Sequence, residues 1–401
     1  MRTYILIFIL LLILLPKGKI LVAQNPVLTT ESTISLLTCG PGPEVYTFFG
    51  HSALRVTDPV LKIDRVYNYG TFDFNVPDFY AQFLNGKLYY MLSVVRYQGF
   101  VPDYINEKRF IKELPLNITL EQKRELFNLL EINYLPENRH YWYDFFTDNC
   151  STRIRDIVVK ATGGKYLWPP EPAEHLTYRQ LIIPYISLNN WAKTGILLML
   201  AAGADQESSQ EGYMFLPDHM HRLFSQAKQA DGTPLGKPEK ILFMPDYPKP
   251  IGTGLLHPYT IFSILLLISW LMVFLRKMPV PLMKFFFFLL FLISGAMGLL
   301  FSYMWFFSAH LVCHANLNLA WAFPLNIFLA VTIWFPKAGM VNKLYSKAMI
   351  MLILLFLVTF SFWKQKIPFE AILFCLTLLP GLYRFSGFEI FRKTKSQDQT
   401  N

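Results

Sequence analysis

Five apolar stretches follow one another in the C-terminal part of the chain, and they constrain its fold more than any other feature. They cover Leu255–Leu275, Val280–Phe306, Leu317–Phe335, Ala348–Trp363 and Ile367–Tyr383. Each is near the roughly 20 residues that a helix needs to cross a hydrocarbon core of ~30 Å, the last two being short. Of 28 acidic residues, only Glu370, Glu389 and Asp398 lie after residue 256. This pattern predicts an all-α bundle of about five transmembrane helices and excludes a purely soluble protein.

The orientation of the bundle follows from its basic residues. If the region before Leu255 is outside the cytoplasm, the cytoplasmic segments hold ten Lys and Arg, and the opposite side holds only Lys364 and Lys366. Positive residues collect on the cytoplasmic side of membrane proteins. Residues 24–256 contain 22 basic and 25 acidic residues, a net charge of −3, so the overall charge of +9 belongs to the membrane flanks. No nucleic-acid partner is expected.

The N-terminus carries an export signal. Arg2 precedes an apolar run from Tyr4 to Leu15, which has the length of a signal-peptide core and is too short for a typical spanning helix. Cleavage is predicted near Ala23, with a retained anchor as the alternative. The predicted organisation is a signal peptide in residues 1–23, a periplasmic domain in 24–254, membrane helices in 255–384 and a cytoplasmic tail in 385–401. The expected location is the bacterial inner membrane.

The region between these ends has the pattern of one folded domain. Alternating stretches at Ser52–Val56, Arg65–Tyr69 and Leu88–Val95 predict strands. Amphipathic spacing over Leu120–Tyr134 and Cys150–Ala161 predicts helices. Strands followed by helices are typical of an α+β domain.

Cys150 is a candidate nucleophile because of its place at a predicted helix start. Asp148 or Asn149 is a suitable N-cap, and the helix continues from Cys150. The positive end of the helix dipole favours the thiolate, which is the reactive form of cysteine. The alternative is a buried structural cysteine, or a disulfide with Cys39 in the oxidising periplasm.

A base for this thiol is expected on a strand. His51, in YTFFGHSALRV, is the candidate, with His140 as its rival and a core position as the alternative role. A cysteine and a histidine distant in sequence are the expected pair of a thiol acyl-transfer enzyme. Asn68, in DRVYNYGTFDF, is the candidate for orienting the imidazole, or else an edge residue. Other candidates for this third group are Asp58, Asp64 and Asp73.

A cluster of polar residues interrupts the apolar membrane region on its outer side. The segment FSAHLVCHANLNLAWAFPLN holds His310, His314, Asn316 and Asn318. Polar side chains at membrane depth are costly and indicate function. The hypothesis is a lipid-substrate site shared with the periplasmic domain, and the alternative is a loop at the headgroups. Two histidines with Cys313 nearby are a weak metal motif, so no metal is predicted.

These motifs resemble a known family. GHSALRV, DRVYNYGTFDF, YDFFTDNCSTRIRD and MFLPD are similar to the periplasmic domain of the Lnb-type lipoprotein N-acyltransferases, over most of residues 30–250. The membrane helices fit the same architecture. The order of His51, Asn68 and Cys150 more weakly resembles circularly permuted papain-like enzymes such as lecithin–retinol acyltransferase. That likeness implies a cysteine at a helix start, packed on an antiparallel sheet that carries the histidine. Papain-like relatives often have a second histidine where Asn68 stands.

The resemblance implies a membrane-bound thiol acyltransferase without a cofactor. Its nucleophile falls on Cys150, its base on His51 and its third polar group on Asn68. It would move an acyl chain from a membrane phospholipid to the N-terminal S-diacylglyceryl cysteine of a lipoprotein, through an acyl-Cys150 intermediate. Competing hypotheses are an anchored cysteine peptidase or amidase acting on cell-wall peptides, and a non-catalytic envelope sensor. The predicted substrate-binding residues are Asn149, Tyr69, Arg55, His310, His314, Asn316 and Asn318.

Overall fold

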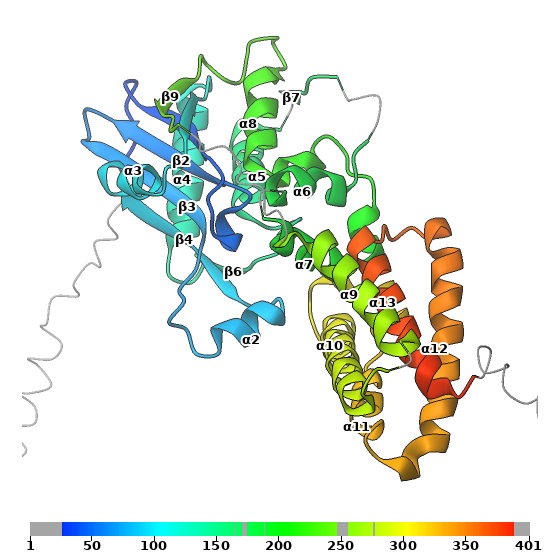
Figure 1. Cartoon of the computed structure of the whole chain (residues 1–401). Helices are drawn as coiled ribbons and strands as arrows, with labels where there is room; N and C mark the ends of the chain where they lie inside the picture. The colour runs from blue at the N-terminus through cyan, green and yellow to red at the C-terminus, as the bar shows by residue number, and fades with distance from the viewer. Residues whose placement is uncertain are drawn as a thin grey trace, which may run out of the picture.

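A computed structural model describes residues 26–164, 166–170, 175–187, 189–246, 256–275 and 277–388. The predicted signal peptide and all but the first residues of the predicted cytoplasmic tail lie outside these ranges. Figure 1 shows a sheet with helices packed on it, followed in the chain by a bundle of helices. The predicted α+β domain with a C-terminal helical bundle is confirmed.

One antiparallel sheet of seven strands forms the centre of the domain, in the order β6-β4-β3-β2-β1-β5-β9. Both faces of this sheet are covered, so β1 is buried at nearly every position rather than at every second one. The strands are β1 (Thr33–Cys39), β2 (His51–Asp58), β3 (Ile63–Thr71), β4 (Tyr89–Arg96), β5 (Ile111–Pro115), β6 (His140–Trp142) and β9 (Lys240–Phe243). A separate small sheet pairs β7 (Tyr166–Leu167) with β8 (Lys228–Gln229).

Helices cover the two faces of the sheet unequally. One face packs against α4, α5 and α8, with Leu54, Leu126 and Ile154 fully buried in the shared core. The opposite face packs against α3, where Val66 and Phe100 meet. The helices of the domain are α2 (Phe79–Leu84), α3 (Tyr97–Asn106), α4 (Leu120–Tyr134), α5 (Cys150–Thr162), α6 (Tyr178–Ile186), α7 (Asn190–Met199) and α8 (Pro217–Gln226).

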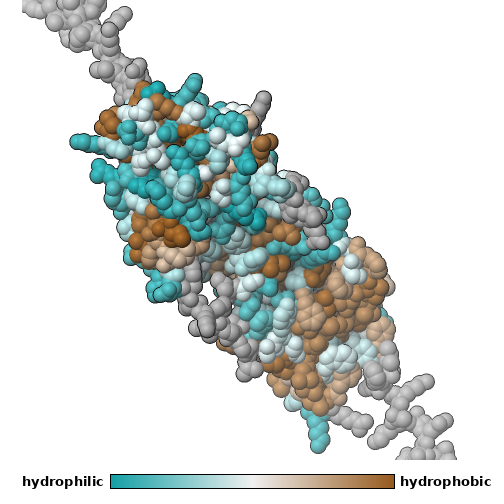
Figure 2. Space-filling view, turned by 90° about the horizontal axis from the view of Figure 1, so that it is seen from above, coloured by the Kyte–Doolittle hydropathy of each residue, from teal (hydrophilic) through white to brown (hydrophobic). Residues whose placement is uncertain are grey.

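The bundle contains three helical segments long and apolar enough to cross a membrane, among the described residues: Val280–Phe306, Pro336–Phe362 and Phe369–Ser386. A fourth apolar helix, Pro258–Phe274, is shorter. The helices are α9 (Pro258–Phe274), α10 (Val280–Phe306), α11 (Asn326–Thr332), α12 (Gly339–Thr359) and α13 (Phe369–Ser386). Apolar side chains gather on the bundle surface, whereas the surface of the domain is largely hydrophilic (Figure 2).

The third apolar stretch departs from the sequence expectation, because Leu317–Phe335 is not one spanning helix. It forms a 3-10 turn at Leu317–Ala320 and the seven-residue α11. Non-helical backbone is tolerated inside a membrane bundle only where protein groups satisfy it. Here Asn326 donates to the Ser294 hydroxyl at 3.0 Å and to the Trp321 carbonyl at 3.1 Å. The Asn326 amide thus satisfies a backbone carbonyl in the break, and it ties the break to α10.

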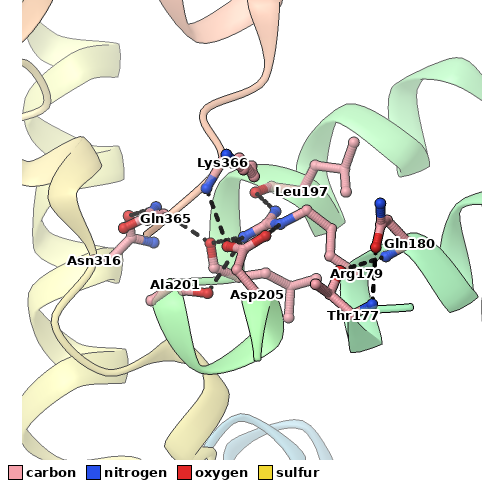
Figure 3. Close-up of polar contacts among 10 residues, drawn as sticks. Thr177, Arg179, Gln180, Leu197, Ala201, Asp205, Asn316, Gln365 and Lys366 are labelled. Atoms are coloured by element: carbon pink, nitrogen blue, oxygen red, sulfur yellow. Dashed lines mark hydrogen bonds and ion pairs between the residues drawn. The ribbon is translucent and has the colours of Figure 1, made fainter. Parts of the chain in front are cut away.

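A buried ion pair lies where the domain meets the bundle (Figure 3). The Arg179 guanidinium of α6 forms two contacts with Asp205, Nε to Oδ1 at 2.8 Å and Nη2 to Oδ2 at 2.9 Å. The two side chains are 5% and 2% exposed. Lys366, in the segment before α13, donates its backbone N–H to the same carboxylate at 3.0 Å. The pair therefore links the domain directly to the bundle.

Replacing Asp205 by asparagine is expected to destabilise the protein strongly. The Arg179 guanidinium would remain buried without its counter-charge, and breaking a buried pair costs roughly 3–5 kcal/mol. We expect a clearly lower midpoint of thermal unfolding for the full chain in detergent. The matched control is Asp156→Asn, since Asp156 is 64% exposed in its pair with Arg155 and exposed pairs contribute only about 0–1 kcal/mol. Equal midpoints for the two variants would contradict a stabilising role for this junction.

Candidate active site

The first turn of α5 is held by its N-cap residue. The Asn149 side-chain oxygen accepts from the backbone N–H groups of Ser151 at 2.8 Å and Thr152 at 3.0 Å. Its amide nitrogen donates to the Phe215 carbonyl at 2.7 Å, and the residue is only 2% exposed. Asn149 therefore fixes the position of Cys150 at the start of the helix. These structural bonds already engage the Asn149 side chain. Its contact with substrate stays a prediction.

Cys150 lies where strands β2 and β3 separate. The paired residues of these strands run from Leu54 opposite Tyr67 to Asp58 opposite Ile63. His51 therefore precedes the part of β2 that pairs with β3. Gly70 on β3 has φ of +83°, and a Cβ atom there would lie 3.4 Å from the Cys150 Cβ. A side chain at Gly70 would be strained in this conformation and would crowd the thiol. The glycine thus lets the start of α5 approach the sheet.

The structure brings Cys150, His51 and Asn68 together. His51 Nε2 donates to Asn68 Oδ1, and the imidazole lies close enough to the Cys150 thiol for each to shift the pKa of the other. Because an amide oxygen accepts, the contact with Asn68 places a proton on Nε2 and leaves Nδ1 as the basic nitrogen. The three aspartates considered as alternatives to Asn68 have other partners: Asp58 accepts from Thr29, Asp64 from Arg55 and Asp73 from Asn75.

Electrostatics favour the ionised form of the pair. Burial alone would raise the pKa of Cys150, but the charge of His51 and hydrogen bonds from His51, Ser52 and Ser151 lower it below its usual value. Burial likewise opposes charge on His51, yet Cys150 and Asn68 raise the pKa of the imidazole. Each partner thus stabilises the charged form of the other, which favours a thiolate beside an imidazolium.

Cys39 behaves differently, although it lies directly opposite His51 in the β1–β2 register. Burial raises the pKa of Cys39 to about 12. Cys39 and Cys150 are both free thiols, so the disulfide considered above is not formed. Of these two buried thiols, Cys150 is therefore the activated one and Cys39 the inert one.

Two tyrosines beside Cys150, the buried Tyr141 and the half-buried Tyr143, were not predicted from the sequence. Burial and then the Cys150 charge raise the pKa of both Tyr141 and Tyr143. Tyr143 stacks on Tyr90 with ring centroids 4.1 Å apart, and Arg153 lies 3.6 Å above the Tyr141 ring. Within the described part of the chain, the Tyr141 hydroxyl has no hydrogen-bond partner. The aromatic run HYWYDFF just before Cys150 was the available signal.

The other predicted substrate-binding residues of the domain are engaged in structural contacts. Tyr69 is 2% exposed, and its hydroxyl accepts from Asn133 at 2.8 Å. Arg55 pairs with Asp64 at 2.8 Å and covers the Tyr97 ring at 3.4 Å. A role of Tyr69 or Arg55 in substrate binding stays a prediction.

The polar cluster of the membrane region connects the helical bundle to the globular domain. His310 Nε2 donates to the Phe83 carbonyl, and His314 Nε2 to that of Ser308, both at 2.9 Å. Asn316 and Asn318 donate to the Leu198 carbonyl at 2.8 and 3.0 Å. Among the residues that the structure describes, no group of three His, Cys, Asp or Glu side chains is placed to hold a metal. Lipid binding by the four predicted residues stays a prediction.

Together, the fold and the site define a class: a membrane protein whose globular α+β domain brings a cysteine at a helix start beside a histidine and an asparagine on neighbouring strands. Residues 24–183 match the Lnb N-terminal periplasmic domain, and residues 251–385 match the Lnb transmembrane domain. The chain belongs to the Lnb family, and it is a membrane enzyme of lipoprotein processing with a periplasmic domain. No curated protein and no solved structure matches it.

Proposed function

We propose that the protein is a thiol acyltransferase that moves an acyl chain from a membrane phospholipid to the N-terminal S-diacylglyceryl cysteine of a lipoprotein. The observation that carries this proposal is the close pair of Cys150 and His51, in which Asn68 holds the imidazole and the two pKa values are shifted toward thiolate and imidazolium. The attachment of its domain to a transmembrane bundle supports a lipid substrate, since the reacting ester of a phospholipid lies at the bilayer surface.

The reaction proceeds in two steps, and both use the Cys150 sulfur and the His51 imidazole. The Cys150 thiolate attacks the ester carbonyl carbon, a C–S bond forms, and the ester C–O bond breaks while His51 protonates the departing lysophospholipid oxygen. The α-amine of the lipoprotein cysteine then attacks the thioester. A C–N bond forms, the C–S bond breaks, His51 takes the amine proton, and the thiolate is restored.

Two features support stabilisation of the negative oxygen that develops in each step. The start of α5 presents the positive end of a helix dipole beside Cys150. The Tyr141 hydroxyl, which has no hydrogen-bond partner among the residues that the structure describes, could donate to this oxygen without first breaking another bond. Cys150 is only 7% exposed, which limits access of water to the thioester. Loss of the acyl chain to hydrolysis would otherwise turn the transferase into a lipase.

The proposal is tested on lipoproteins in a strain where this chain is the only candidate transferase. Mass spectrometry of lipoprotein N-termini is expected to find three acyl chains with the native chain, and two chains with a free α-amine with Cys150→Ser. Triacylated lipoproteins in the Cys150→Ser strain would overturn the proposal. Altered cell-wall peptides would favour the amidase alternative, and a phenotype seen only on deletion of the helices would favour the sensor.

A further inference from the structure

The connection between β3 and β4 forms an arm that the proposed chemistry does not use. The α2 arm, defined as residues 72–88, contains α2 and exposes three aromatic side chains: Phe74 is 53%, Tyr80 80% and Phe83 53% exposed. Figure 1 shows α2 at the end of the domain that lies toward the bundle. Large apolar groups on a protruding arm are unfavourable in water, so they indicate a contact.

Hydrogen bonds connect the arm to the end of α10. The Ala309 N–H donates to the Asn85 carbonyl at 2.8 Å, and His310 Nε2 donates to the Phe83 carbonyl at 2.9 Å. The Tyr303 hydroxyl donates to Asn85 Oδ1. These contacts hold the arm at the level of the last turn of α10, on the side of the bundle that carries the periplasmic domain.

The length of α10 is sufficient to bring its end to the bilayer boundary. This helix has 27 residues, or ~40 Å at about 1.5 Å per residue, which exceeds the hydrocarbon thickness of ~30 Å. Phe306, Phe307 and Leu311 at its end are 66%, 70% and 71% exposed. They extend the apolar surface of the spanning helix toward the arm. Aromatic side chains concentrate at this depth because the ring is apolar and its edge tolerates water.

We propose that the α2 arm lies in the outer boundary of the bilayer, with Phe74, Tyr80 and Phe83 in contact with phospholipid. The occupant of this surface is the bilayer that the spanning helices already define, because the exposed aromatic groups of the arm continue those of α10. A soluble partner protein that covered only the arm would leave Phe306 and Phe307, at the end of α10, without a partner of their own.

A chain of aromatic rings connects the arm to the nucleophile, and this second part of the inference rests on the proposed function. Ring centroids lie 4.9 Å apart for Phe74 and Phe72, 5.2 Å for Phe72 and Tyr90, and 4.1 Å for Tyr90 and Tyr143. Tyr143 flanks Gly70 together with Cys150. These rings form a continuous apolar contact between the arm and the thiol, and we infer that an acyl chain reaches Cys150 along it.

Bilayer contact is tested by spin labelling of the full chain in vesicles of phosphatidylethanolamine and phosphatidylglycerol. A Cys150→Ser background removes the one activated thiol, and labels are placed by Tyr80→Cys and Phe74→Cys. The control is Val60→Cys, in the turn between β2 and β3 and 63% exposed. We expect a several-fold higher ratio of oxygen to nickel-chelate collisions at 80 and 74 than at 60. Water-like ratios at all three positions would overturn the proposal. This readout needs no catalysis, so it stands even if acyl transfer fails.

The lipid route is tested with Cys150 intact. Phe83→Asp is expected to lower acyl transfer from vesicle phospholipid several-fold, because a charged side chain at position 83 disfavours contact between the arm and the lipid. Alkylation of Cys150 by water-soluble iodoacetamide should not change, and Val60→Asp should change neither rate. Unchanged transfer in Phe83→Asp, or an equal fall in alkylation, would overturn the route.

Discussion

Replacing Cys150 by alanine is expected to abolish acyl transfer and the covalent intermediate. Loss of a nucleophile removes the covalent pathway, with an expected fall of roughly 10⁴- to 10⁶-fold. After incubation of the native chain with phospholipid vesicles, mass spectrometry should find the mass of one acyl chain on the peptide containing Cys150. Hydroxylamine should remove it, because it cleaves a thioester. Neither the adduct nor product should form with Cys150→Ala.

The control for this experiment is Cys375→Ala. Cys375 is a buried free thiol in α13, far along the chain from the helix start that carries Cys150. Both variants remove one buried sulfur atom, so a general loss of packing would affect them alike. Transfer should persist in Cys375→Ala. An adduct that survives in Cys150→Ala would show that another group forms the intermediate.

His51→Ala is expected to slow alkylation of Cys150 at neutral pH. In the native chain the imidazolium holds the pKa of Cys150 below its usual value of 9.0, so thiolate is present at lower pH. Without His51, burial is the largest remaining influence and raises the pKa of the thiol. The rate at pH 7 should fall about tenfold for each unit by which the pKa rises. Iodoacetamide rates measured between pH 5 and 10 should show the midpoint of the profile moving to higher pH.

Two controls separate this effect from unfolding. Cys39, with a pKa of about 12, should remain unreactive at pH 7 in both proteins, and its labelling would report a loosened core. His140→Ala should leave the rate at Cys150 unchanged, because His140 stacks on Tyr89 and is exposed. Equal rates at Cys39 and Cys150 would mean that Cys150 is merely structural.

Burial of individual side chains is the feature that the sequence does not reveal. Asn149 and Tyr69 are polar groups next to Cys150 and Asn68 in the sequence, and both are 2% exposed and hydrogen-bonded within the fold. A residue type does not reveal which side of a strand or helix becomes buried. The same limit hid Tyr141, whose hydroxyl is notable only because the folded chain leaves it without a partner among the described residues.

Local patterns determined the start of α5 and the presence of a membrane bundle, because capping and runs of apolar residues act within a few turns of the chain. The place of His51 beside Cys150 was decided by tertiary structure, since it depends on where β2 and β3 separate and on the left-handed conformation of Gly70. The broken path of residues 317–335 was decided in the same way. Side chains from distant segments satisfy part of its backbone: Asn342 of α12 donates to the Thr332 carbonyl, and the Gln365 side chain accepts from the Leu317 N–H. Such bonds exist only once those segments have packed.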